Sequence, residues 1–135
     1  MKHSSANSPV DRPEILSRLR QRLRQLRAQQ ESLVWKLADG DPMIMGSFYQ
    51  VMKTCTQPNC RCQRGEKHGP FAALSWSVHG KRRMVMVRAE DARTVEVKVA
   101  AYKRFVRGLR ELDTLNSEAD RLLGEIGELL REEYP

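Results

Sequence analysis

A cluster of cysteines marks the middle of the chain: all three lie within eight positions, and a histidine follows six residues later. The loop at residues 55–70 reads CTQPNCRCQRGEKHGP and contains Cys55, Cys60, Cys62 and His68. Three thiolates and one imidazole form a ligand set that suits tetrahedral Zn²⁺. To share one ion, the second and third cysteines must sit on a turn, and Pro58 and Gly65 supply bends. The loop therefore predicts a closed, structural zinc site.

Other interpretations of this loop stay open. A disulfide between Cys55 and Cys60 is disfavoured by the odd cysteine count and by a cytosolic location. The cysteines can instead be small buried hydrophobic residues. A catalytic thiol, activated by neighbouring cations with His68 as base, lacks a recognisable orienting carboxylate or oxyanion donor. If His68 only begins a turn, water or Glu66 is the alternative fourth ligand.

Two stretches with apolar residues at alternating steps of three and four flank the loop, a spacing typical of heptad helices. The first, residues 12–39, ends before Gly40 and Pro42 and has the seam Leu16, Leu19, Leu23, Leu26, Gln30, Leu33 and Leu37. The second, residues 90–133, has the seam Tyr102, Phe105, Leu109, Leu112, Asn116, Ala119, Leu123, Ile126 and Leu130. Residues 94–99 also fit a short strand, but their valines continue the second seam, so we expect helix there.

Residues 45–88 change to an alternating pattern that favours a small sheet. Strands are expected at 47–54, 71–78 and 81–88, and His79-Gly80 is typical of a two-residue hairpin turn. The expected fold class is α+β: a three-stranded antiparallel sheet with a cysteine-rich zinc loop, flanked by two long coiled-coil-like helices. Residues 12–135 are expected to form one domain after a disordered, Ser-rich tail at 1–11.

Charge is concentrated in the same middle segment. The 135 residues carry a formal net charge of +7, and residues 43–88 hold eight Lys or Arg against one acid. Such a surplus favours an anionic partner. The expected nucleic-acid contacts are Arg61, Arg64, Lys67, Lys81, Arg82 and Arg83, beside the aromatic side chains Phe48, Tyr49 and Trp76. The sequence contains no signal-peptide core and no apolar run of membrane-spanning length, so we expect a cytoplasmic protein without a membrane partner.

The charges of the two helices predict self-association. If the helices fold back from a common hinge, the arginines of 18–27 face the basic residues of 103–110, and like charges meet. The acidic stretch 113–133 then extends beyond the hairpin. We therefore expect a homodimer in which the arginines of 18–27 lie near the acidic stretch of the other chain. The alternative is ordinary packing of two amphipathic helices on their own sheet.

The cysteine loop, followed by Phe71, Leu74-Ser75-Trp76 and a Gly80-Lys81 turn, resembles the signature of a family of short bacterial and archaeal proteins, the domain of unknown function 6788. The family pattern is C-G-K-P-x-C-x-C-x-x-G-x-x-H-G-P-Y, and the similarity covers about residues 47–105. Thr56, Gln57 and Phe71 depart from the pattern without removing a ligand. The resemblance implies no established activity. Some members resemble genes carried near mobile elements, which favours an accessory role with nucleic acid.

Together these features predict a non-enzymatic, zinc-stabilised nucleic-acid-binding or mobile-element accessory module. No small-molecule substrate is expected. The alternative is a protein-interaction adaptor that acts through its heptad helices as a coiled-coil dimer. Salt separates the two functions, because phosphate contacts weaken steeply with ionic strength whereas helix association is comparatively insensitive.

Overall fold

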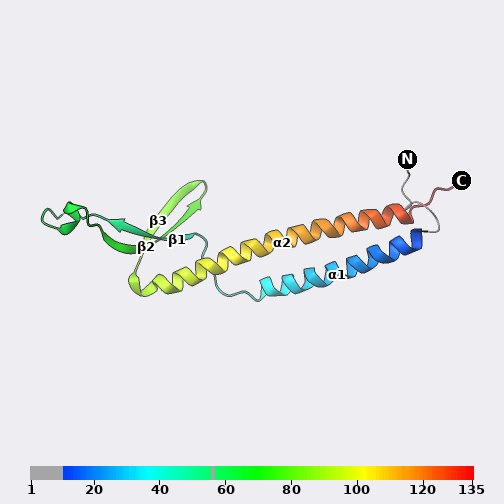
Figure 1. Ribbon diagram of the computed structural model, residues 1–135, viewed down its shortest axis with the longest axis horizontal. Coiled ribbons are helices and arrows are strands. Elements are labelled where there is room, and N and C mark those ends of the chain that lie inside the picture. The colour runs from blue at the N-terminus through cyan, green and yellow to red at the C-terminus, as the bar shows by residue number, and fades with distance from the viewer. Residues whose placement is uncertain (1–10, 56) are drawn as a thin grey trace. The chain divides into compact units, whose positions relative to one another are not determined.

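The computed structural model describes residues 11–55 and 57–135, and it contains two long helices and one small sheet (Figure 1). The elements in chain order are α1 (Arg12–Ala38), β1 (Ser47–Lys53), the 3₁₀ helix η2 (Arg61–Arg64), β2 (His68–Val78), β3 (Lys81–Val87), the 3₁₀ helix η3 (Ala89–Asp91) and α2 (Ala92–Leu130). The predicted α+β class with a three-stranded antiparallel sheet is confirmed. Apart from Asp11, the expected disordered tail at 1–11 lies outside the described residues.

The chain divides into two compact units. The hairpin unit combines residues 11–39 with 107–135, and the sheet unit comprises residues 40–106. Helix α2 contributes its C-terminal part to the first unit and its N-terminal part to the second. Residues 94–99 are helical, as the continued seam predicted. No helix in the described part of the chain has the length and apolar character needed to cross a membrane.

The sheet has the strand order β1-β2-β3 with antiparallel neighbours. A two-residue turn joins β2 to β3, with φ of 50° at His79 and 79° at Gly80. Positive φ at both central residues is the condition for the turn type whose twist matches a hairpin, so the predicted turn is confirmed. Strand β2 begins earlier than expected, at His68, because pairing with β1 continues to Lys53.

The two helices of the hairpin unit run antiparallel, side by side (Figure 1). The core of this unit has two clusters, each with one buried leucine of α1. In α2 the prediction was wrong by one position, because Leu123 and Leu130 of the expected seam are 53% and 51% exposed, whereas their neighbours Leu122 and Leu129 are buried. One cluster contains Leu16, Ile126 and Leu129, and the other contains Leu26, Ala119 and Leu122. Spacing of three and four places these residues on one face of each helix. Burial of apolar side chains, at roughly 25 cal/mol per Å² of surface removed from water, is what stabilises such a pair.

The charge pairing between the helices differs from the expectation. The arginines of 18–27 do not face residues 103–110; Arg22 instead donates from Nη2 and Nε to Glu118 Oε2, at 2.6 and 3.1 Å. The first fifteen residues of α2 belong to the sheet unit, so α1 meets α2 only from about Gly108 onward, where Leu37 lies close to the glycine. The acidic stretch thus lies beside α1 of the same chain, and no partner chain is needed to supply it.

Candidate metal centre

The loop between β1 and β2 folds into two consecutive turns. Pro58 and Asn59 form the first, closed by a hydrogen bond from Cys60 N to Gln57 O at 3.3 Å. The second is η2, which begins after Cys60 and ends at Gly65, where φ is 100°. A left-handed residue of this kind suits glycine, which lacks a Cβ. The second and third cysteines therefore lie on a turn, as a shared ligand role requires.

The turns bring the four predicted ligands together. The sulfur atoms of the three cysteines and a ring nitrogen of His68 all lie within 4.8 Å of one another. The Sγ atoms of Cys55 and Cys62 are 3.3 Å apart, and Cys60 Sγ lies 3.0 Å from His68 Nε2. Zinc–sulfur bonds of about 2.3 Å in a tetrahedron place ligand atoms about 3.8 Å apart. The four side chains therefore form a cluster compatible with one metal ion.

The site is shielded unevenly. Cys62 is buried with 3% of its surface exposed, whereas Cys55, Cys60 and His68 are half-buried. The backbone N–H of Cys55 donates to Cys62 Sγ at 3.2 Å. Such outer contacts orient a ligand atom.

His68 is held by its place in the sheet. It is the first residue of β2 and pairs with Lys53 of β1. The next residue, Gly69, has φ of 128°, and a Cβ there would lie 2.9 Å from Val51 O. Only glycine fits both the conformation and the close approach of β1. The role of Gly69 could not be predicted from the sequence, because its contact with β1 exists only once the strands are paired.

The protonation of the cysteines differs within the cluster. The pKa of Cys60 is lowered to about 6, chiefly because the backbone N–H of Cys62 donates to its sulfur, with further hydrogen bonds from the side chains of Cys55, Cys62 and His68. The pKa of Cys55 is raised: the backbone N–H of Gln57 lowers it, but hydrogen bonds with the Cys62 and Cys60 side chains outweigh that effect. Thiolates are the form that binds metals, so Cys60 is prepared for this role near neutral pH.

The arrangement fits metal binding better than a catalytic pair. The contact between Cys60 and His68 alone has the geometry of a nucleophile and its base. Two further thiols, however, converge on the same point. A catalytic dyad needs no such additional sulfurs, whereas a tetrahedral ion needs four donors. Glu66 is not part of the cluster, so His68 is the better candidate for the fourth ligand.

The predicted nucleic-acid contacts are exposed but do not form one patch. Three of them, Arg61, Arg64 and Lys67, lie in the metal loop before β2 begins. The other three, Lys81, Arg82 and Arg83, follow the hairpin turn at the far end of β2. Strand β2 has 11 residues, which span about 30 Å at roughly 3.3 Å per residue. The structure thus separates the six residues into a loop cluster and a hairpin cluster at opposite ends of the sheet (Figure 1).

The aromatic side chains expected beside these cations lie in the sheet itself. Phe48 and Tyr49 are in β1, and Trp76 of β2 is paired directly with Arg83. All three aromatic side chains are half-buried. The hairpin cluster therefore has an aromatic neighbour, Trp76, in the sheet register.

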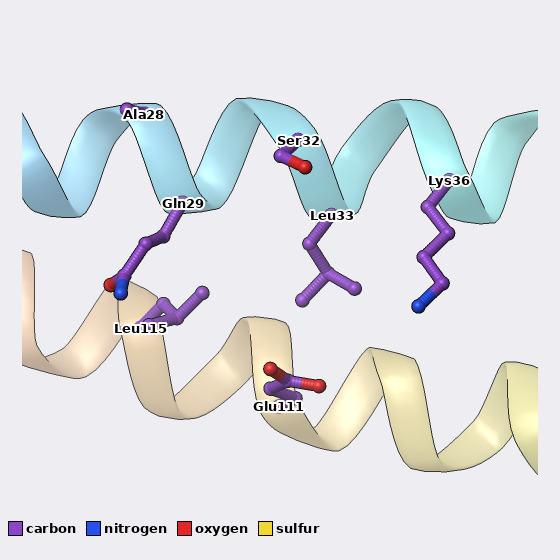
Figure 2. A pocket seen from close by; sticks show the side chains of 7 residues that line it. All are labelled: Ala28, Gln29, Ser32, Leu33, Lys36, Glu111 and Leu115. Carbon is purple, nitrogen blue, oxygen red and sulfur yellow. The ribbon is translucent and has the colours of Figure 1, made fainter.

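The hairpin unit has a groove of about 440 Å³ between α1 and α2 (Figure 2). It is lined by Ala28, Gln29, Ser32, Leu33, Lys36, Glu111 and Leu115. Figure 2 shows Leu33 and Leu115 between the two helices and Lys36 reaching from α1 toward α2. The lining offers one amine and one carboxylate rather than a cluster of metal-binding or nucleophilic groups. Among the described residues, the cysteine loop is therefore a better candidate than this groove for a site that needs metal-binding or nucleophilic side chains.

Comparison with known proteins identifies a family but no close relative. The family model described as Domain of unknown function (DUF6788) matches residues 16–97, a range that includes the complete Cys/His cluster. No curated protein and no solved structure matches the chain.

Proposed function

Because the chain belongs to the DUF6788 family, whose function is unknown, its role has to be inferred from its own residues, and we propose that it is a non-enzymatic, zinc-stabilised module that binds nucleic acid. Zinc is the proposed ion, since three thiolates and an imidazole match its preference and leave no open position for substrate. A cytoplasmic accessory role beside mobile elements is part of the same proposal.

The distribution of charge carries the proposal. The sheet unit contains twelve Lys and Arg against five Asp and Glu, whereas the rest of the chain has twelve of each. The whole net charge of +7 therefore belongs to the unit that contains the Cys/His cluster. A local surplus of this size attracts the phosphate backbone through release of counterions. The aromatic residue paired with Arg83 adds a stacking surface for unpaired bases.

In this proposal the ion braces the basic surface. The loop cluster lies between the ligands themselves, because Arg61 stands between Cys60 and Cys62, and Arg64 and Lys67 stand between Cys62 and His68. Fixing the ligands fixes the backbone from which these cations project, and this lowers the entropy lost on binding. The ion has a structural role, and the contacts to phosphate come from the protein.

The loop cluster and the hairpin cluster are about 30 Å apart, which corresponds to about 9 base pairs of duplex at roughly 3.4 Å each. This distance sets the lengths of duplex that the experiment compares. Binding would be measured by fluorescence anisotropy against duplexes of about 6 and about 20 base pairs and a single strand of matching length, over a range of salt concentrations. One variant replaces Arg61, Arg64 and Lys67 with Gln, and another replaces Lys81, Arg82 and Arg83 with Gln. The matched control replaces Arg18, Arg20 and Arg24 of α1, which are also exposed, with Gln.

On the long duplex, the plot of log K against the logarithm of salt concentration is expected to be less steep for each sheet-unit variant. Its slope should fall in magnitude by about 2 to 3, since each variant removes three phosphate contacts that contribute roughly 0.9 each. On the short duplex, which cannot reach both clusters, either variant alone is expected to leave substantial binding. The α1 control is expected to bind like the parent protein. Zinc content measured in parallel shows that the loop is intact. Binding that is insensitive to salt, or equal loss in the control, contradicts the proposal.

The adaptor function and the helical homodimer have weaker support. Leu16 and Leu26 of the first seam, and Ala119 and Ile126 of the second, are already buried within the hairpin unit of a single chain. A coiled-coil partner would have to bind outside this seam. Nucleic-acid binding therefore remains the proposed function.

A further inference from the structure

Strand β3 is an edge strand whose side chains are unusually exposed for a strand rich in apolar residues. Its sequence is KRRMVMV, and no other strand in the described part of the chain pairs with its outer edge. Met84, Val85 and Met86 have 54%, 46% and 39% of their surface exposed. A regular edge of seven residues without proline or bulge is a template for pairing with another strand. The opposite edge, β1, is less suitable because its register shifts between Val51 and Lys53.

The register of the β2–β3 hairpin determines which backbone groups of β3 can pair with a further strand. Val78 and Lys81 close the two-residue turn and so form a hydrogen-bonded pair, and hydrogen-bonded pairs alternate along an antiparallel ladder. Lys81, Arg83, Val85 and Val87 therefore direct their N–H and C=O groups to β2. Arg82, Met84 and Met86 direct theirs outward. The available donors and acceptors are centred on Met84, the middle residue of the strand.

The charges of β3 select its partner. If a second β3 pairs antiparallel around Met84, Arg82 lies opposite Met86 of the other copy and Arg83 lies opposite Val85. All seven residues are paired, and none of the three cations lies directly opposite another. Centring the pair on Arg82 instead would place Arg82 opposite its own copy and Lys81 opposite Arg83, and like charges directly opposite each other are destabilising. The basic half of the strand thus complements its apolar half.

We propose that β3 binds β3 of a second copy of this chain, with Met84 on the two-fold axis, to form a continuous six-stranded antiparallel sheet. The Met84 pair is a hydrogen-bonded pair in this dimer, as is each pair of Arg82 with Met86. This interface is closed by symmetry, so association stops at the dimer. The proposal rests neither on nucleic-acid binding nor on the ion, although the paired strands include the hairpin cluster of Lys81, Arg82 and Arg83.

Substitution with either charge at two positions tests the register. Met84→Lys and Met84→Glu both bring like charges together on the axis, so both are expected to weaken the dimer by at least about fivefold. Met86→Lys is expected to weaken it similarly, because the lysine lies opposite Arg82 of the other copy. Met86→Glu is expected to tighten it about twofold to tenfold, since two cross-strand ion pairs form per dimer. The measurement is the dissociation constant by analytical ultracentrifugation.

Hydrogen exchange of the unmodified full chain provides a second measurement that needs no variant. At concentrations that favour the dimer, the amides of Arg82, Met84 and Met86 are expected to become protected, whereas those of Arg83 and Val85 are protected at every concentration. A monomer at all accessible concentrations overturns the proposal. So does a dimer unaffected by Met84→Lys, which would lie at another surface, or growth into larger oligomers. If Met84→Lys and Met84→Glu change the dissociation constant in opposite directions, the partner strand is not a second β3, and the proposal is likewise overturned.

Discussion

Gln30 Nε2 donates a hydrogen bond to Asn116 Oδ1, at 2.7 Å, across the interface of α1 and α2. These are the residues that interrupt the two leucine seams, and the structure places them opposite each other. Gln30 is buried with 7% of its surface exposed, and its Oε1 accepts a second hydrogen bond from Arg27 Nη1, at 3.0 Å. A polar pair at the interface of two helices favours one register, because a shift breaks this hydrogen bond and leaves the buried Gln30 Nε2 without its acceptor.

We therefore expect Asn116→Leu to destabilise the hairpin unit by about 1–3 kcal/mol, the cost of leaving the buried Gln30 amide without this partner. The double variant with Gln30→Leu is expected to recover most of that loss, because the buried polar group is then removed as well. Gln25→Leu, at an exposed position of α1, is the control. The free energy of unfolding would be measured by urea titration with far-ultraviolet circular dichroism. A double variant less stable than Asn116→Leu alone contradicts the expectation.

The ion pair between Arg22 and Glu118 is expected to contribute more than the exposed pairs of the same unit. The two side chains are 42% and 23% exposed, and two guanidinium nitrogens donate to one carboxylate oxygen. Arg22→Gln should cost about 1 kcal/mol, whereas Arg18→Gln, which removes an exposed pair with Glu14, should cost about 0.3 kcal/mol. Equal losses in urea titrations of the two variants would show that the inter-helical pair contributes nothing beyond surface charge.

The outcome for these elements shows what local patterns can and cannot predict. The hairpin at His79-Gly80 and the Cys/His cluster were predicted because turn residues and ligand spacing act within a few positions. The pairing of the helices depends on where residue 108 lies relative to residue 37, across seventy residues of intervening chain. A common hinge was therefore the wrong assumption. The polar residues at 30 and 116 contained the missing signal, since their hydrogen bond aligns the two helices.

Two helical glycines are expected to respond oppositely to substitution by alanine. Gly124 faces open space, so Gly124→Ala should stabilise α2 by about 0.5–1 kcal/mol through helix propensity. A Cβ at Gly108 would lie 2.5 Å from Leu37 Cδ2, so Gly108→Ala must displace that side chain. We expect Gly108→Ala to be at least about 1 kcal/mol less stable than Gly124→Ala. Adding Leu37→Ala to Gly108→Ala should then be less damaging than Leu37→Ala alone. Thermal melts of the four variants check this, and equal stabilisation by both glycine substitutions contradicts it.

The cysteines are expected to differ in reactivity once any ion has been removed by a chelator. With a pKa of about 6, Cys60 is largely thiolate at neutral pH, whereas the raised pKa of Cys55 keeps it mostly protonated. Iodoacetamide at neutral pH should therefore modify Cys60 before Cys55. Lowering the pH through 6 should slow the reaction of Cys60, because its thiolate is protonated there. Peptide mass spectrometry identifies the modified residue, and the preference should disappear in denaturant. Faster modification of Cys55 contradicts this account of the cluster.

The ligand role of His68 is tested by comparing it with the other histidine that the structure describes. His68→Asn removes a donor from the cluster and should weaken zinc binding by more than the roughly 10–100-fold that loss of an outer contact costs. His79→Asn is the matched control, because this residue is exposed and asparagine tolerates its positive φ. Elemental analysis should give one zinc per chain for the control and much less for His68→Asn.

Removal of the ion from the parent protein by a chelator should change hydrogen exchange in the sheet unit and leave the hairpin unit unchanged. Residues 57–70 should lose hydrogen-exchange protection, because the ion would hold their turns together. Residues 12–38 should keep theirs, since Leu16 and Leu26 belong to cores formed entirely within the hairpin unit. If the His68→Asn variant still binds one zinc per chain, another group is the fourth ligand of the ion. If the parent protein contains no zinc and chelation changes nothing, the turns are stable through their own hydrogen bonds, and the structural role of the ion is wrong.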